Sequence, residues 1–330
     1  MYPKLSIDLD CIRSNTSTLL GLVGKREVFG VIKGVAGSME VAGAMVEGGV
    51  DGLADSRLEN LIRLKDFFTT PLMLLRQPMV NEIATAIKFA DYILLTEIEI
   101  ARQISLEATK AGKVQRIILM LEAGDLREGI TEPELDEIAE EVQRLTSIEL
   151  YGLAINAGCS FAVAPTKKQL VSLVESKKRL VNRFSQDVPI LSGGNSSCID
   201  ILLNGKMPQE INQLRIGEAI LLGHEPINYR PLDGFKQGAF SLEAEVIEVK
   251  KKNNDQGGQA VIALGRQDIA MAPIKTDSGS IFNRSSDHLT IKPAVDAKLQ
   301  VGGRIKIEPS YFAVLAAMIS PYVDKEYIGL

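Results

Sequence analysis

Apolar residues in the first two thirds of the chain fall into short runs separated by longer amphipathic segments. This alternation is expected when parallel strands are joined by helical crossovers. In the amphipathic segments, such as 96–112, 133–147 and 166–185, apolar residues recur at helical spacing. The apolar runs predict eight strands, at 28–32, 51–54, 72–75, 91–95, 116–121, 149–155, 188–193 and 213–217. Eight strand–helix repeats predict an α/β fold, a (β/α)8 TIM barrel over residues 11–230.

The pattern changes after about Pro231, where apolar and polar residues alternate with a period of two. Clusters of Gly, Asn and Asp separate the alternating stretches, which lie at 240–252, 259–267, 288–294 and 302–310. We therefore expect a smaller, mostly β domain over residues 231–330. Residues 4–10 alternate in the same way, so the strand at 1–10 is assigned to this second domain.

Composition and charge exclude several classes of function. The formal net charge of −5 argues against binding to a nucleic-acid backbone. No apolar stretch approaches the roughly 20 residues that span a bilayer, and the first residues lack a signal-peptide pattern, so we expect a cytoplasmic protein with no membrane partner. Three cysteines without a CxxC pair and two distant histidines predict neither a disulfide framework nor a metal site.

Several polar residues follow the predicted barrel strands, at the end of a barrel where catalysis takes place. Lys33 ends the first apolar run, the segment SGGNSS (192–197) follows the seventh, and Arg215 ends the eighth. Each has an ordinary explanation on its own: a lysine that reaches solvent, or a turn with a serine cap. Glycines, hydroxyls and a helix N-terminus also suit a phosphate group, and a desolvated lysine amine can form a covalent bond. Together these features meet the requirements of pyridoxal phosphate.

Motifs along nearly the whole chain resemble the alanine racemase superfamily, the fold-type III pyridoxal-phosphate enzymes, and most closely its alanine/ornithine racemase branch. The resemblance implies an amino-acid racemase that acts on ornithine as first choice, or on lysine, arginine or alanine. The segments that carry it are IDLDCIRSN, VFGVIKGVAG, GDLREGI, SGGNSS, LRIGEAILLG, ALGRQD, SSDHL and SPYVDKEY.

The resemblance also implies roles for single residues. Lys33 would bind the cofactor covalently and serve as one acid/base, and Arg215 would contact the pyridine nitrogen. An arginine gives up its proton with difficulty, which favours return of a proton to Cα over transamination. The remaining cofactor contacts would come from the phosphate segment, from an arginine near the phenolic oxygen and from a ring-facing amide: Gly193, Gly194, Asn195, Ser196, Arg127 and Asn156.

Racemisation needs a second acid/base on the opposite face of the substrate. Alanine racemases use a tyrosine from the other subunit, but the similar stretch here has Arg266, and Gly37 replaces a further tyrosine. We expect Asp287 and His288 to supply this function. Two other candidates are Tyr311, for which a packed strand aromatic is the favoured interpretation, and Cys159.

The resemblance further implies a homodimer in which each β domain completes the partner's active site. A substrate with a cationic side chain would need a carboxylate, for which Glu225, Asp268, Asp287 and Asp324 are candidates. Asp55, Arg57 and Arg76 also lie near strand ends, where a helix cap and a surface ion pair would explain them. A decarboxylase of the same fold, a non-catalytic pyridoxal-phosphate carrier and a cofactor-free racemase are the alternatives.

Overall fold

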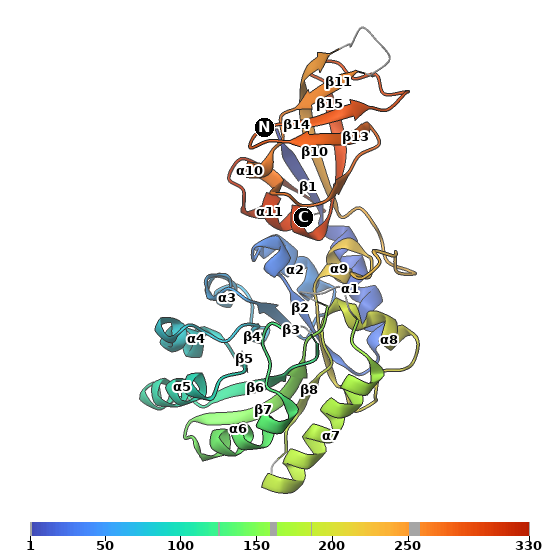
Figure 1. Ribbon diagram of the computed structural model, residues 1–330. Helices are drawn as coiled ribbons and strands as arrows, with labels where there is room; N and C mark the ends of the chain where they lie inside the picture. Colours follow the sequence, from blue (N-terminus) through green and yellow to red (C-terminus); the bar gives the residue numbers. More distant parts are fainter. Residues whose placement is uncertain (1, 125, 159–163, 186, 251–257, 330) are drawn as a thin grey trace.

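The computed structural model describes residues 2–124, 126–158, 164–185, 187–250 and 258–329. Two parts lie one above the other, a barrel ringed by helices and a separate sheet (Figure 1). The barrel is closed, and each of its strands pairs in parallel with the next, with β2 beside β9. Its strands are β2 (Glu27–Val31), β3 (Gly52–Asp55), β4 (Leu72–Leu74), β5 (Tyr92–Leu95), β6 (Gln115–Leu121), β7 (Ile148–Ile155), β8 (Ile190–Ser192) and β9 (Gln213–Ile216). The predicted eight-stranded barrel is confirmed.

Side chains fill the inside of the barrel, so it is a packed core and not a pore. The inward residues form a cluster of their own: Phe29, Val31, Ala54, Met73, Leu94, Ile118, Met120, Ala154 and Ile190. The helices outside the strands are α1 (Leu9–Val23), α2 (Met39–Glu47), α3 (Leu58–Lys65), α4 (Ile83–Phe89), α5 (Ile98–Lys110), α6 (Glu132–Arg144), α7 (Lys167–Phe184), α8 (Ile199–Leu203) and α9 (Glu218–Leu222). Their apolar faces pack on the outer faces of the strands in a second, larger core.

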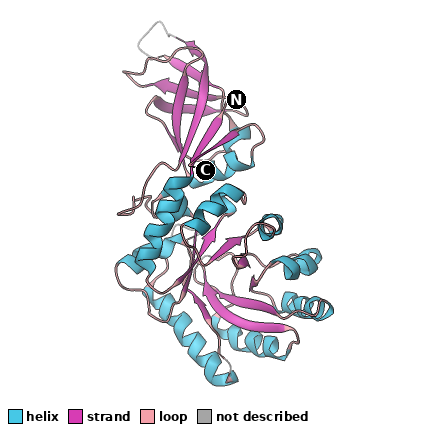
Figure 2. Ribbon diagram, turned by 180° about the vertical axis from the view of Figure 1, so that it is seen from behind, coloured by secondary structure: helices cyan, strands magenta, loops and turns pink. Residues whose placement is uncertain are grey.

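The second part is an antiparallel sheet that also takes in the first strand of the chain (Figure 2). β1 (Lys4–Asp8) pairs antiparallel with β10 (Phe240–Lys250) and parallel with β16 (Asp324–Ile328). The opening strand therefore belongs to this sheet, although the chain enters the barrel directly afterwards. The other strands are β11 (Gln259–Ile262), β12 (Ile274–Lys275), β13 (Gly279–Arg284), β14 (Leu289–Pro293) and β15 (Arg304–Pro309).

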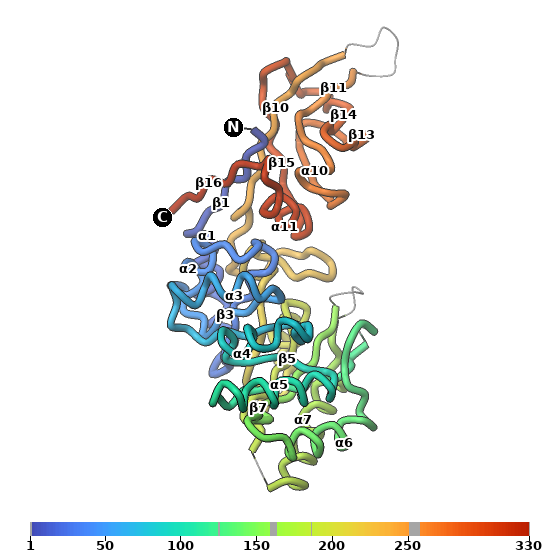
Figure 3. The backbone as a smooth tube through the Cα atoms, turned by 90° about the vertical axis from the view of Figure 1, so that its left-hand side faces the viewer, coloured from blue at the N-terminus to red at the C-terminus, as the bar shows by residue number. Residues whose placement is uncertain are grey.

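Two helices accompany this sheet, α10 (Arg266–Ile269) and α11 (Tyr311–Ile319). The interpretation of Tyr311 as a strand aromatic is wrong, because Tyr311 begins α11. The preceding Ser310 accepts a hydrogen bond from the Ala313 N–H and so starts the helix there. α11 lies where the sheet meets the barrel, against the turn at Lys33–Val35 (Figure 3).

Among the described residues, no helix combines the length and the apolar character needed to cross a membrane.

Candidate active site

A cavity of about 720 Å3 opens at the carboxyl ends of the barrel strands and is lined on one side by α11. Six of the eight residues that we expected to contact a cofactor line it: Lys33, Arg127, Asn156, Asn195, Ser196 and Arg215. The sheet domain contributes Tyr311, Phe312, Leu315 and Ile319 of α11 to the same cavity. The fold thus gathers these residues from six separate segments of the sequence into one place.

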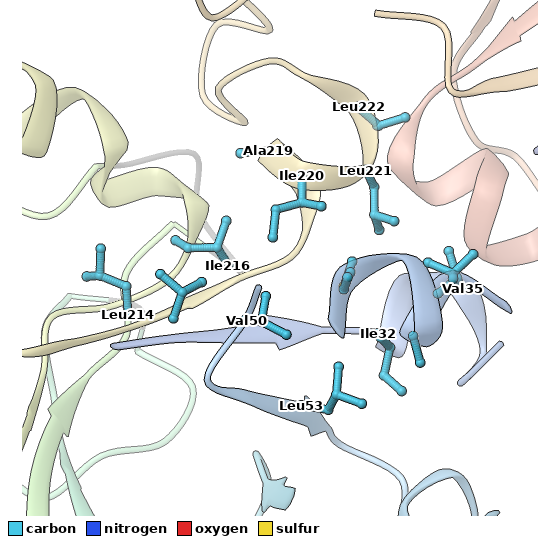
Figure 4. Close-up of a cluster of buried hydrophobic side chains, with 14 of the residues drawn as sticks. Ile32, Val35, Val50, Leu53, Leu214, Ile216, Ala219, Ile220, Leu221 and Leu222 are labelled. Carbon is cyan, nitrogen blue, oxygen red and sulfur yellow. The ribbon is translucent and has the colours of Figure 1, made fainter. Parts of the chain in front are cut away.

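Lys33 lies directly beyond β2, at the start of a single 3-10 turn. Its neighbours Ile32 and Val35 are fully buried. They pack beside Leu53 and the α9 residues Ile220 and Leu221 (Figure 4). This apolar packing holds the backbone at Lys33 in place, while the lysine side chain lines the cavity.

The SGGNSS segment is held by its own side chains. Asn195 donates one hydrogen bond to the Asn156 Oδ1 and another to the Ala157 carbonyl oxygen, each 2.9 Å long. Ser196 is buried, and its hydroxyl accepts a hydrogen bond from the Ala219 N–H at 3.2 Å, which joins the segment to the first turn of α9. Ser196 is therefore fixed between two helix starts, where backbone N–H groups favour an anion.

The two glycines of this segment, Gly193 and Gly194, are needed for different reasons. A Cβ atom at Gly193 would lie 2.6 Å from Cγ2 of Ile211, so packing requires a glycine there. Gly194 has a φ of +122°, a conformation that residues with side chains rarely adopt. The proposed contact of their backbones with a phosphate stays a prediction.

Arg215 is the penultimate residue of β9, and its side chain is buried in the barrel mouth. The guanidinium donates to the Ser192 hydroxyl and, at 2.7 Å, to the Ile155 carbonyl oxygen. These two hydrogen bonds fix the orientation of the cationic group beside the cavity.

Arg127 and Asn156 reach the cavity from the ends of β6 and β7. Arg127 forms an ion pair with its neighbour Glu128, which also lines the cavity. Asn156 is oriented by the hydrogen bond from Asn195. Their predicted contacts with cofactor and substrate stay predictions.

Asp287 and His288 lie in the turn between β13 and β14, outside the cavity of their own chain. The His288 Nδ1 is 2.9 Å from the Asp287 carboxylate, and both side chains are exposed. Arg266 is beside this turn, since its backbone N–H donates to the Ser285 carbonyl oxygen. Arg266, Asp287 and His288 therefore lie together at one exposed end of the β domain. Arg266 is the residue that replaces the expected tyrosine, and the other two are the predicted acid/base residues.

Tyr311 is the other acid/base candidate among the described residues, and it does line the cavity. It packs so closely on the turn after Lys33 that a Cβ atom at Gly34 would lie 2.5 Å from the Tyr311 ring. Cys159 lies outside the described residues.

Asn60 occupies the space next to Gly37, the position where a tyrosine was expected by resemblance. Gly37 has a φ of +66°, and a Cβ atom there would lie 2.5 Å from Cγ of Asn60. Asn60 in turn donates to the carboxylate of Asp55 at 2.9 Å. The missing aromatic side chain has therefore been replaced by a hydrogen-bonded group from α3.

Asp55 was expected in a helix cap with a surface ion pair, but the N-cap of α3 is Arg57 and the Asp55 side chain is buried. Its carboxylate is fully buried and accepts hydrogen bonds from the Arg57 N–H, at 2.8 Å, and from Asn60. Burial raises the pKa of Asp55 to about 6. Arg57 lines the cavity, whereas Arg76 forms the expected ion pair with Glu82 at 3.2 Å.

Glu218 also lines the cavity, although it was not predicted as a site residue from the sequence. It is the first residue of α9 and lies two positions beyond the end of β9. Burial, followed by the neighbouring Glu225, raises the pKa of Glu218 to about 7. The signal was present in the LRIGEAILLG motif, as an acidic residue at a strand end before an apolar helix.

None of the four carboxylates considered for a cationic substrate lines the cavity of its own chain. Glu225 is buried and accepts from the N–H groups of Ile227, Asn228 and Arg230. Asp268 accepts from the Gly265 N–H. Asp287 is in the exposed turn with His288, and Asp324 begins β16.

Known proteins match this chain over its whole length. A family model for the alanine racemase N-terminal domain matches residues 7–226. Lysine racemase from Thermotoga maritima is 33% identical over 99% of this chain and 99% of its own length. Ornithine racemase from Acetoanaerobium sticklandii is 33% identical over 99% of this chain and 100% of its own length. The chain belongs to the alanine racemase superfamily.

Solved structures agree with this assignment. Alanine racemase from Clostridium difficile 630, in complex with cycloserine, has a TM-score of 0.77 at 22% identity and covers 99% of this chain and 96% of its own. That likeness confirms the fold: a barrel followed by a β domain. Membership of the superfamily, in its alanine/ornithine racemase branch, makes the protein a pyridoxal-phosphate-dependent amino-acid racemase.

The residues that line the cavity fit pyridoxal phosphate. They include four cations, Lys33, Arg57, Arg127 and Arg215, against two acids, Glu128 and Glu218. This excess of positive charge suits a phosphate group together with a substrate carboxylate. The buried Ser196 hydroxyl and the nearby start of α9 provide neutral donors for the phosphate.

Proposed function

We propose that this racemase interconverts the L and D forms of a free diamino acid, with ornithine as the first substrate to test and lysine as the second. The observation that carries the proposal is the convergence of Lys33, Ser196 and Arg215 on one cavity. The names of the two relatives that match the full chain, lysine racemase and ornithine racemase, support the choice of substrate. Arginine and alanine are the further candidates.

In this proposal each residue has a defined task. Pyridoxal phosphate, when bound, supplies an electron sink for the pair left at Cα. Lys33 removes or returns the Cα proton on one face of the substrate. Arg215 faces the ring nitrogen and keeps its own proton. Ser196, Asn195 and the backbones of Gly193 and Gly194 hold the phosphate, while Arg127 and Asn156 face the substrate carboxylate and the ring.

The second acid/base is proposed to be His288, oriented by Asp287 and supplied by the other subunit of a homodimer. The His288 imidazole, with its Nδ1 2.9 Å from the Asp287 carboxylate, has the arrangement of a general acid/base and its orienting carboxylate. Because this pair lies outside the cavity of its own chain, it could serve only the partner's cavity. Tyr311 is the second candidate, since it lines the cavity from its own chain.

Incubation with single L-amino acids in deuterated water tests the function. We expect L-ornithine or L-lysine to gain deuterium at Cα and to yield the D enantiomer. Exchange without inversion would show that only one acid/base works. Release of carbon dioxide would favour the decarboxylase, which the full-length racemase relatives do not favour.

The cytoplasm stays the predicted location of the protein.

A further inference from the structure

Glu218 differs from the other acidic residue of the cavity in its surroundings. Of the two acids that line the cavity, Glu128 is paired with Arg127. The Glu218 carboxylate accepts no hydrogen bond from any of the described residues. The His224 Nδ1 is 4.0 Å from the Glu218 Oε1.

Among the described residues, no cation is hydrogen-bonded to the Glu218 carboxylate, although Lys33 is close enough to lower its pKa. The His224 Nδ1 is 3.2 Å from the Glu225 carbonyl oxygen, and burial lowers the pKa of His224, which keeps the ring neutral. The Glu225 carboxylate is occupied by three backbone N–H groups. Lys33 is the remaining charged neighbour, and in the proposed function its amine is joined to the cofactor. A desolvated carboxylate without a partner is costly unless a cation reaches it.

Strand register places Glu218 close to the reacting centre. β2 and β9 are neighbours, with Gly30 beside Ile216. Lys33 lies three residues after Gly30, and Glu218 lies two residues after Ile216. Both therefore lie at the same end of two adjacent strands, which are about 4.8 Å apart. The rest of α9 is buried: Ala219, Ile220, Leu221 and Leu222 hold Glu218 in place (Figure 4).

We propose that Glu218 binds the side-chain ammonium of a diamino acid and so selects ornithine or lysine over neutral amino acids. The inference rests on the proposed function, since it needs an amino acid bound at Lys33. Four single bonds of about 1.5 Å each separate Cα of ornithine from its terminal nitrogen. This length suits the span between two residues on adjacent strands, and the ammonium supplies the cation that the carboxylate lacks.

The test compares ornithine with norvaline, which has the same carbon chain without the terminal amine, in the holoenzyme. Glu218→Gln keeps the shape and removes the charge. We expect it to lower kcat/KM for ornithine about 10- to 100-fold, mainly through KM, and to change the value for norvaline less than threefold. Glu210→Gln, which removes an exposed charge outside the cavity, is the matched control and should change neither.

Glu218→Asp gives a second, independent readout. It keeps the charge but shortens the side chain by one methylene. Lysine is longer than ornithine by one methylene, so the preference should move from ornithine towards lysine. The readout is the ratio of kcat/KM for lysine to kcat/KM for ornithine, measured on one variant. A general loss of folding would lower both values together and leave this ratio unchanged.

Several outcomes would overturn the inference and leave the racemase intact. One is a wild-type enzyme that racemises norvaline as well as ornithine. Another is a Glu218→Gln variant that binds pyridoxal phosphate more weakly and loses activity equally on ornithine and norvaline. That result would show that the Glu218 carboxylate acts on the cofactor and not on the substrate side chain. If the wild type exchanges the Cα proton of no amino acid, the proposed function itself fails.

Discussion

At the scale of single residues, the cavity contains an acid whose charge is unfavourable in the empty protein. The pKa of Glu218 is raised to about 7 from its ordinary 4.5. Between pH 4.5 and about pH 7, Glu218 keeps its proton in the folded protein but loses it in the unfolded chain. The free energy of unfolding therefore falls as the pH rises through this range. Above about pH 7 the full cost of the charge is present.

Glu218→Gln should therefore stabilise the cofactor-free protein in a pH-dependent way. We expect little difference at pH 4.5 and a gain of about 1–3 kcal/mol in the free energy of unfolding at pH 8. Urea unfolding at both pH values measures this. A difference between variant and wild type that does not change with pH would contradict the assigned environment.

Gly37 gives a second prediction at this scale. Its positive φ and the contact with Asn60 leave no room for a side chain, so Gly37→Ala should destabilise the protein by about 1–3 kcal/mol. In an Asn60→Gly background the steric part of this cost should disappear, because the colliding atoms are gone. Equal costs in both backgrounds would show that Asn60 does not fill this space.

At the scale of elements, α11 and the turn that begins at Lys33 are in direct contact. Gly34→Ala would push the Tyr311 ring away from its place in the cavity wall. We expect kcat/KM to fall about tenfold or more, since small displacements near reacting groups cost much activity. Tyr311→Ala should remove the collision, so the double variant should be no worse than Tyr311→Ala alone. A Gly34→Ala enzyme with wild-type activity would contradict this contact.

The elements that the sequence predicted share a simple physical origin. Barrel strands are buried on both faces, so they read as continuous apolar runs. β13 and β16 were not predicted because most of their residues are exposed or half-buried, which leaves no clear alternation. The segment 311–319 is apolar almost throughout, so a period of two could not be distinguished from a helical period.

The site was predictable in part for the same reason. Lys33, Ser196 and Arg215 stand out because each is a polar residue at the end of an apolar run. The importance of Glu218 depends on which way one side chain faces, and the contact of Asn60 with Gly37 depends on the packing of α3. Neither can be read from spacing along the chain.

At the scale of the whole molecule, the predicted homodimer places Lys33 and His288 of one active site on different chains. Lys33→Ala and His288→Ala should each be inactive alone. When the two variants are dissociated, mixed and reassembled, random pairing makes about half of the dimers heterodimers. Each heterodimer has one complete site out of two, so activity should return to about a quarter of wild type. No recovery, or a His288→Ala enzyme that is active alone, would contradict the shared site and favour Tyr311.

The central claim is that Lys33 is the residue that binds pyridoxal phosphate. Borohydride reduction of the holoenzyme, followed by proteolysis and mass spectrometry, tests it most directly. We expect the mass of the reduced cofactor on the peptide that contains Lys33, and no visible absorbance band of lysine-bound cofactor in Lys33→Ala. A cofactor attached to another lysine, or a Lys33→Ala protein that keeps the band, would contradict the account.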